Sequence, residues 1–292
     1  MEKRDRGVTS GSVRRCPRSA RTTNNHCHLD RSIPFRHGRE CGVERPAVRW
    51  LGYTYGGITI TYERSSSFVT QNYYAKHLAA ERLRACYDLA PPRVQAYLEA
   101  EIDFVLQKTS SSMTVLELGC GYGRVLRRLL PRVRAAVGID TSFPSLRMAL
   151  DFLDRPESLR LAQMDAVHLG FAGRAFDFTI CIQNGISAFG VNQQQLFAEA
   201  IRVTRSGGTV LFSSYSDSFW ADRLRWFEIQ SAHGLIGPID YQATGNGVIV
   251  CTDGFRATTV DAARFRNLAG ASGLVPKIVE VDGSSIFCEV NV

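Results

Sequence analysis

The sequence contains no apolar run long enough to cross a membrane. Apolar stretches such as Val210–Phe212 and Val248–Cys251 end far short of the roughly 20 residues that a spanning helix needs. A secretory signal is also missing, because no charged n-region, apolar h-region and cleavage site follow one another. The eight cysteines are scattered, which argues against a disulfide framework. We therefore expect a cytoplasmic protein with reduced thiols and no membrane partner.

A zinc-finger pattern is absent as well. The first 50 residues contain histidines and cysteines, but no two cysteines are separated by two residues as in a zinc finger. The residues concerned are His26, Cys27, His28, His37 and Cys41. The sequence therefore predicts no metal site.

An excess of positive charge is confined to one end of the chain. The net charge is +7, and residues 1–50 alone hold twelve Lys/Arg against five Asp/Glu. Residues 51–292 hold 23 of each sign and are therefore neutral. An enzyme that grips polyanionic RNA usually needs a basic face, so the neutral body argues against a nucleic-acid partner.

The N-terminal segment differs from the rest of the chain. Residues 1–50 are rich in Arg, Ser, Thr and Asn and show no periodicity, so we expect them to be disordered. The alternation in residues 48–63 predicts a small hairpin or edge strand. We assign residues 1–65 to a basic, disordered extension and residues 66–292 to one domain.

Beyond this extension the sequence alternates helical and strand patterns. Helical spacing from Gln71, interrupted at Pro91-Pro92, predicts N-terminal helices within residues 71–106. Short apolar strands then alternate with helices, which predicts an α/β fold with a mostly parallel sheet covered on both faces. The predicted strands are 114–118, 135–139, 159–163, 176–182 and 209–214, and the predicted helices are 122–130, 143–153, 193–204 and 217–232. A helix over 260–272 and the pair Asp282-Gly283 between apolar runs predict a final antiparallel hairpin.

Alternate glycines follow the first predicted strand. Gly119, Gly121 and Gly123 allow the backbone to pass close beneath a ligand. A nicotinamide-binding turn would have its third glycine at position 124, which is Arg124. The acid Glu117 would repel a phosphate but can accept hydrogen bonds from a cationic amino group. The spacing therefore favours a nucleoside ligand that has no pyrophosphate.

Two further acids follow the next two predicted strands. Asp140 ends the second strand, where its carboxylate can accept both hydroxyls of a ribose. Asp165 follows the third strand and is placed to accept from the exocyclic amine of adenine. Asp140 alone does not exclude a nicotinamide oxidoreductase, which stays an alternative at this point. Three acids after three successive strands are a more specific signal than any one of them.

Residues 114–215 resemble the class I (Rossmann-like) S-adenosylmethionine-dependent methyltransferase superfamily. Glu117–Gly123 matches its glycine motif, and Asp140 and Asp165 match its ribose-binding and adenine-binding acids. Its fourth and fifth strand regions match Phe176–Gly185 and Thr204–Phe212. The resemblance implies a seven-stranded sheet with an antiparallel C-terminal hairpin, S-adenosyl-L-methionine as methyl donor and S-adenosyl-L-homocysteine as product. The cofactor-binding residues expected on this basis are Glu117, Gly119, Cys120, Gly121, Gly123, Asp140, Thr141, Asp165, Ala166 and Gln183.

A methyltransferase needs positioning more than a fixed catalytic triad, because a sulfonium methyl is already activated. The candidate catalytic residues are Tyr73, Tyr74, His77, Asn184 and Tyr215, with His168 as a further acid or base. No spacing fixes a role for any of them. The Asn/Asp-Pro-Pro-aromatic motif of enzymes that methylate base amines is replaced by Gln183-Asn184-Gly185-Ile186, which argues against a nucleobase amine. We expect the acceptor pocket to be formed by residues 71–106, 189–195 and 216–247.

These patterns together predict a methyltransferase that acts on a small-molecule acceptor. One alternative is an RNA or protein methyltransferase that uses the basic N-terminal segment as an arm, and another is a non-catalytic nucleoside-binding protein. The acceptor atom, the catalytic base and the oligomeric state are not encoded in any motif. The only methionine between Met1 and Met148 is Met113, which lies inside the predicted core. A mis-assigned start, with a native non-Met initiator near residue 69, is therefore a further hypothesis.

Overall fold

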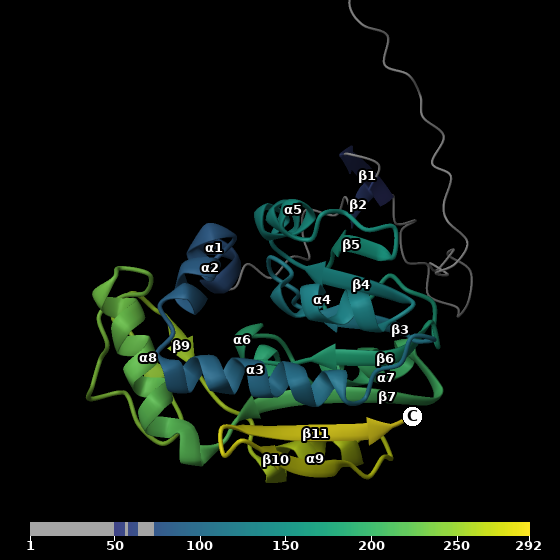
Figure 1. The fold of residues 1–292 in the computed structure, drawn as a ribbon. Helices are drawn as coiled ribbons and strands as arrows, with labels where there is room; N and C mark the ends of the chain where they lie inside the picture. Colours follow the sequence, from purple (N-terminus) through teal and green to yellow (C-terminus); the bar gives the residue numbers. More distant parts are fainter. Residues whose placement is uncertain (1–49, 56–57, 64–72) are drawn as a thin grey trace, which may run out of the picture. The chain divides into compact units, whose positions relative to one another are not determined.

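A nine-stranded mixed sheet organises the part of the chain that the structure describes (Figure 1). The computed structural model describes residues 50–55, 58–63 and 73–292, the first two ranges by their backbone alone. The strands lie in the order β1-β2-β5-β4-β3-β6-β7-β11-β10. Their bounds are β1 Trp50–Tyr55, β2 Ile58–Glu63, β3 Thr114–Leu118, β4 Ala135–Asp140, β5 Leu159–Gln163, β6 Phe176–Cys181, β7 Thr204–Tyr215, β10 Lys277–Val281 and β11 Ser285–Asn291.

Seven of these strands form the mixed sheet that the sequence predicts. β5, β4, β3, β6 and β7 pair in parallel, and β11 then pairs antiparallel with both β7 and β10. All five residues of β3 are buried, because a central parallel strand is covered on both faces. The chain reverses between β10 and β11 through Asp282 and Gly283, both in the left-handed region at φ 59° and 60°. The predicted antiparallel C-terminal hairpin is therefore confirmed.

Strands β1 and β2 extend the sheet at its other edge. They form an antiparallel pair in which Trp50 is opposite Glu63, and β2 runs parallel to β5 with Ile60 beside Leu161. The hairpin predicted over residues 48–63 is present. Residues 1–49, with the histidines and cysteines considered as zinc ligands, lie outside the described residues. The assignment of 1–65 to a disordered extension stays a prediction, although the hairpin lies within that range.

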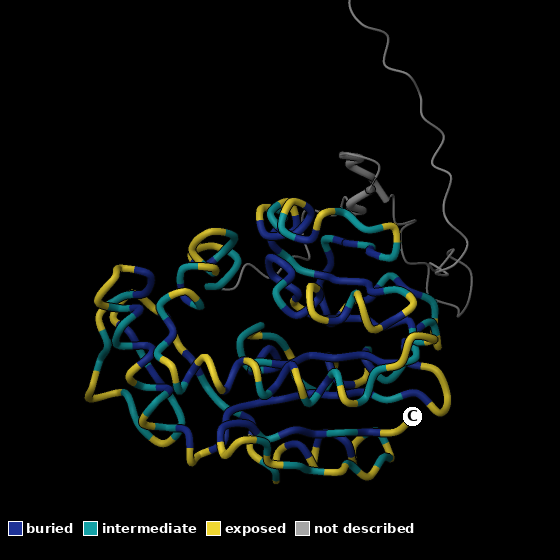
Figure 2. Tube along the Cα trace, viewed as in Figure 1, coloured by how far each residue is buried: buried dark blue, intermediate teal, exposed yellow. Residues whose placement is uncertain are grey.

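Helices cover both faces of the sheet (Figure 1). One buried apolar cluster joins α3, α4 and α5 to the strands, and a second joins α7 and α9 to the opposite face. Figure 2 shows the strands buried between helices whose outer sides are exposed. None of the described helices is both long and apolar enough to span a membrane. The helix bounds are α1 Tyr73–His77, α2 Glu81–Asp88, α3 Pro92–Leu106, α4 Arg124–Leu129, η1 Leu130–Arg132, α5 Phe143–Phe152, α6 Gly185–Ala188, α7 Gln193–Val203, η2 Asp217–Phe219, α8 Trp220–Ala232 and α9 Ala262–Gly270.

A third apolar cluster lies beyond the carboxyl ends of the parallel strands. It packs α1, α2 and the start of α3 against α8 and the short strands β8 (Ile249–Val250) and β9 (Arg256–Ala257). We call α1, α2, α8 and β8–β9 the cap. Its helices are joined by a hydrogen bond of 2.8 Å from Trp226 Nε1 to the Cys86 carbonyl. Arg82 adds two bonds of 2.9 Å to the carbonyls of Gly234 and Leu235, just beyond α8.

Candidate active site

A cavity lies where the cap meets the carboxyl ends of the parallel strands. Its lining combines the turns that follow β3, β4, β5 and β6 with side chains from α1, α2, α3 and α8. Nine of the ten residues predicted to bind a cofactor line it, namely Glu117, Gly119, Cys120, Gly121, Asp140, Thr141, Asp165, Ala166 and Gln183. The sheet topology therefore brings four separate turns of the chain to one place.

The glycine turn between β3 and α4 requires residues without a side chain. Gly119 has a φ of 76°, and a Cβ there would lie 2.4 Å from Cζ of Phe189. Gly123, the tenth predicted residue, does not line the cavity. It precedes α4 with a φ of 91°, and a Cβ would lie 2.7 Å from Cδ1 of Leu153. Gly123 is thus needed for the entry into the helix and its packing.

The Asp140 carboxylate connects two of the turns. Its Oδ2 accepts a hydrogen bond of 2.9 Å from the Gly121 N–H, and its Oδ1 accepts one of 2.8 Å from the Ser142 N–H. Burial raises the pKa of Asp140, while these two backbone donors oppose that shift. Each carboxylate oxygen can accept more than one hydrogen bond, so Asp140 can hold the turn and still bind a ligand hydroxyl.

Unpaired polar atoms of opposite charge converge in the cavity. Oε2 of Glu117, Nε and Nη2 of Arg124 and Nε2 of Gln183 are buried and have no hydrogen-bond partner among the described residues. Burial raises the pKa of Glu117 to about 8, and Arg124 is the main opposing influence. Arg124 itself is held over the ring of Tyr87 at 4.9 Å, and its Nη1 lies 3.3 Å from Glu99. Buried polar groups are normally satisfied, so this set indicates a polar, zwitterionic ligand.

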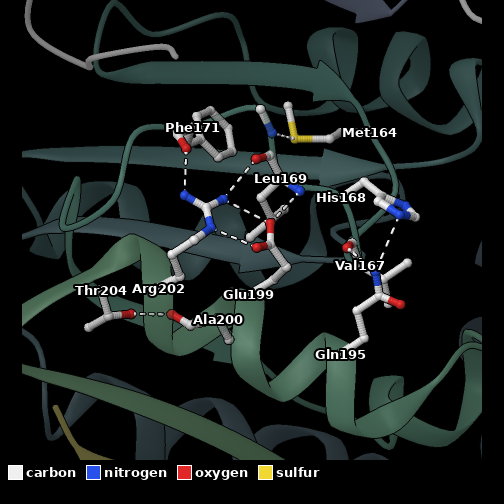
Figure 3. A network of polar contacts seen from close by, with 11 residues as sticks. Met164, Val167, His168, Leu169, Phe171, Gln195, Glu199, Ala200, Arg202 and Thr204 are labelled. Atoms are coloured by element: carbon white, nitrogen blue, oxygen red, sulfur yellow. Dashed lines mark hydrogen bonds and ion pairs between the residues drawn. The ribbon is translucent and has the colours of Figure 1, made fainter. Parts of the chain in front are cut away.

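The loop that carries Asp165 is tied to α7 by a network of charged groups (Figure 3). Arg202 donates to the carbonyl oxygens of Leu169 and Phe171 at 2.8 and 2.9 Å, and it also binds Glu199. Glu199 in turn accepts from the Leu169 N–H at 2.8 Å. The backbone from Asp165 to Phe171 is thereby held by one guanidinium and one carboxylate.

The variant Arg202→Met should weaken cofactor binding by roughly three- to tenfold. Methionine removes both bonds to the loop, each with a net contribution of about 1 kcal/mol, and so loosens the position of Asp165. Titration calorimetry with S-adenosyl-L-homocysteine measures the change. Arg205→Met is a matched control, because Arg205 pairs with Asp177 and has no bond to this loop. Equal affinities in the two variants would contradict the role of the network.

Three of the polar residues considered as catalytic candidates lie away from the cavity lining. Tyr73 donates a hydrogen bond to Asp253 and packs against His77, with the ring centroids 4.6 Å apart and the rings tilted by 34°. Neither Tyr73 nor His77 lines the cavity. His168 is also outside the lining, and its Nε2 lies 3.3 Å from Nε2 of Gln195.

The other three candidates, Tyr74, Asn184 and Tyr215, do line the cavity. The Asn184 amide is already engaged, since it donates to the Thr258 carbonyl at 2.9 Å and accepts from Ser214 at 2.7 Å. Asn184 therefore links β7 to the segment after β9. Tyr74 and Tyr215 contribute aromatic surface next to the cofactor turns, and burial raises the pKa of both phenols.

Sequence reasoning missed Arg124 as a site residue. Its position directly after the third glycine distinguishes the turn from the nicotinamide pattern but predicts no role for its side chain. The signal that could have identified it is a cation at the start of the helix that faces three acids. The aromatic residues Tyr87, Tyr97 and Phe227 of the lining were also missed, because their helical spacing resembles that of ordinary core residues.

Comparison with known proteins agrees with this geometry. The family described as "Methyltransferase domain" matches residues 115–208. No curated protein sequence matches the chain.

Two solved structures illustrate the shared fold. The PH0226 protein from Pyrococcus horikoshii OT3 is 21% identical, with 70% of this chain and 93% of that chain covered and a TM-score of 0.53. The N-methyltransferase NodS from Bradyrhizobium japonicum WM9, solved in complex with S-adenosyl-L-homocysteine, is 15% identical. That match covers 74% of this chain and 94% of NodS, with a TM-score of 0.50. These two structures share the fold of this chain. The family match over residues 115–208, with the glycine turn, the strand-end acids and the sheet order, identifies a class I S-adenosylmethionine-dependent methyltransferase domain in this part of the chain.

Proposed function

We propose that this domain transfers the methyl group of S-adenosyl-L-methionine to a small-molecule acceptor by in-line displacement. The observation that carries the proposal is the continuity of the cavity from the cofactor turns into a chamber walled by aromatic rings. The rings are those of Tyr74, Tyr87, Tyr97, Tyr215, Trp226 and Phe227. Such a chamber under a cap suits a compact acceptor, whereas a polynucleotide would need an open, basic groove. The neutral charge of residues 51–292 supports the same choice.

The cavity residues fit the cofactor. Oε2 of Glu117 would accept from its ammonium group, and Nε and Nη2 of Arg124 would bind its carboxylate, so the buried unpaired atoms gain partners. Asp140 would accept from the ribose hydroxyls and Asp165 from the adenine amine. The turn residues Gly119, Cys120, Gly121, Thr141, Ala166 and Gln183 would provide backbone and side-chain surface around it. Gly123 would act indirectly, by shaping the helix entry.

When bound, S-adenosyl-L-methionine supplies an activated methyl group on a sulfonium. The chain's own contribution is to orient the acceptor, exclude water and remove a proton where the acceptor requires it. The aromatic walls would orient a planar acceptor through stacking and apolar contact. Tyr74 and Tyr215 are the candidates for polar contact with it. We also propose a cytoplasmic location, because the five described cysteines are all buried and free, as in proteins of a reducing compartment.

The experiment is a titration of S-adenosyl-L-homocysteine into the purified chain, followed by a screen of small acceptors with tritium-labelled methyl donor. We expect micromolar binding, and labelled product with at least one low-molecular-weight acceptor. Deletion of residues 1–49, which keeps strands β1 and β2 in the sheet, should leave both results unchanged. Labelling of RNA or protein that depends on those residues would contradict a small-molecule acceptor. Binding without transfer to any acceptor class would favour a nucleoside-binding protein.

A further inference from the structure

Arg223 is a buried cation on the cavity-facing side of helix α8. It is only 1% exposed, and it precedes Trp226, Phe227 and Gln230 by three, four and seven residues. These spacings place all four side chains on one face of the helix. Trp226, Phe227 and Gln230 line the cavity, so Arg223 lies beside its wall on the acceptor side.

The guanidinium of Arg223 has no acidic partner. Its Nη1 donates to the Gly247 carbonyl at 2.9 Å and its Nη2 to the Thr258 carbonyl at 3.5 Å, while its Nε is buried without a hydrogen-bond partner among the described residues. It lies over the ring of Tyr215 at 4.5 Å and within 5.7 Å of the ring of Phe227. None of the ion pairs between described residues involves Arg223. A buried charge is normally paired, so an uncompensated one is a costly feature for the fold to maintain.

The carboxyl groups of the cavity do not balance this charge. Glu117, Asp140 and Asp165 all belong to the turns after β3, β4 and β5. Glu101, on α3, contributes to the raised pKa of Tyr97 and of Tyr215. Its carboxyl already accepts three hydrogen bonds from other groups. Arg223 therefore places a positive charge behind the ring of Tyr215, which lines the cavity.

We infer that the acceptor is a small planar carboxylic acid, bound as its anion, and that Arg223 selects it over neutral and cationic analogues. The inference rests on the proposed function. Arg223 does not line the cavity, so it acts as a positioning residue through its field and through the ring of Tyr215. One unit charge at about 6 Å in a medium of effective dielectric constant about 20 changes the affinity for an anion by up to roughly 100-fold. The same field repels an ammonium group.

The test compares ligands that differ only in charge. Benzoate and 2-naphthoate, each beside its primary amide and its aminomethyl analogue, are titrated into full-length protein saturated with S-adenosyl-L-homocysteine, with tryptophan fluorescence as readout. We expect each acid to bind at least tenfold more tightly than its amide, and the amine to bind most weakly. Arg223→Met should remove this preference, and Arg223→Lys should retain most of it. A purely structural role of Arg223 would change the affinities of all three analogues together.

Equal affinities across each series, tighter binding of the amines, or no binding of either acid to the loaded protein would overturn the inference. The comparison of acid, amide and amine on wild-type protein tests the inference even where Arg223→Met does not fold. The affinity for S-adenosyl-L-homocysteine, measured first on each protein, is the control. If folded wild-type protein fails to bind S-adenosyl-L-homocysteine, the proposed function itself fails, and this result is distinct from a failure of charge selection.

Discussion

Asp140→Ala is expected to lower the affinity for S-adenosyl-L-homocysteine by at least about 100-fold. The carboxylate accepts from the N–H groups of Gly121 and Ser142 and is proposed to accept from both ribose hydroxyls. Hydrogen bonds to a charged group contribute about 1.5–3 kcal/mol each, so loss of two ligand bonds and of the loop anchor reaches this range. Titration calorimetry on the wild-type and variant proteins measures the change.

A partly buried carboxylate at the opposite end of the strands, that of Asp177, provides the control for Asp140. Asp177 accepts a hydrogen bond of 2.6 Å from the Thr114 N–H at the start of β3, at the end of the strand opposite the cavity. Asp177→Ala removes the same kind of anchor and should leave the affinity for S-adenosyl-L-homocysteine within about twofold of wild type. Asp140→Asn, which keeps one acceptor oxygen, should be intermediate. Unchanged affinity in a folded Asp140→Ala protein would refute the assignment of Asp140.

The sheet could be predicted from the sequence because its strands are short, apolar and regularly separated. β3 and β5 begin and end at the predicted residues, and β11 was recognised from the Asp-Gly turn that precedes it. Strand β7 is longer than predicted, since it begins directly at the end of α7. Burial on both faces makes each central strand a continuous apolar run, and this is a local property that sequence carries well.

The cap could be predicted only in outline, because tertiary contacts determine its details. The helical pattern from Gln71 is divided into α1 and α2 at Ala80, which has a φ of 50° and donates to Oγ of Ser145 on α5. The two-residue strands β8 and β9 are too short to show a period in sequence. The proposed acceptor chamber is built largely from this part of the chain, which explains why the sequence predicts the proposed cofactor residues better than the residues around an acceptor.

The buried charges were the least predictable part of the site. The buried Arg223 and Glu101 and the partly buried Arg124 lie on helices, where a charged residue in a sequence is normally assigned to the solvent face. Their burial follows from tertiary packing, which no local pattern encodes: Arg223 lies on a helix of the cap, and Glu101 lies where α3 packs on β7 and β11. The three acids at strand ends were predictable, in contrast, because a parallel sheet places the carboxyl ends of its strands together.

Glu101→Leu is expected to lower the free energy of unfolding by on the order of 3 kcal/mol. Glu101 is fully buried, and its carboxyl accepts from the Gln183 N–H and from the hydroxyls of Ser213 and Ser285 at 2.6 to 2.9 Å. These bonds join α3 to β7, β11 and the turn after β6. Leucine fills a similar volume but leaves the two hydroxyls without this acceptor, and the Gln183 N–H keeps only Ser213 Oγ at 2.8 Å. Urea unfolding measures the loss.

The Glu101→Gln variant separates hydrogen bonding from charge. Burial raises the pKa of Glu101 from 4.5 to about 7, so the folded protein retains a proton that the unfolded chain releases between these values. Stability from this group is therefore full below pH 4.5 and decreases as the pH rises through 7, by on the order of 3 kcal/mol. Glutamine does not titrate, so the variant should gain stability relative to wild type between pH 5 and pH 8. If the free energies of unfolding of the two proteins change with pH in parallel, the pKa of Glu101 is not raised in the fold, and this prediction is wrong.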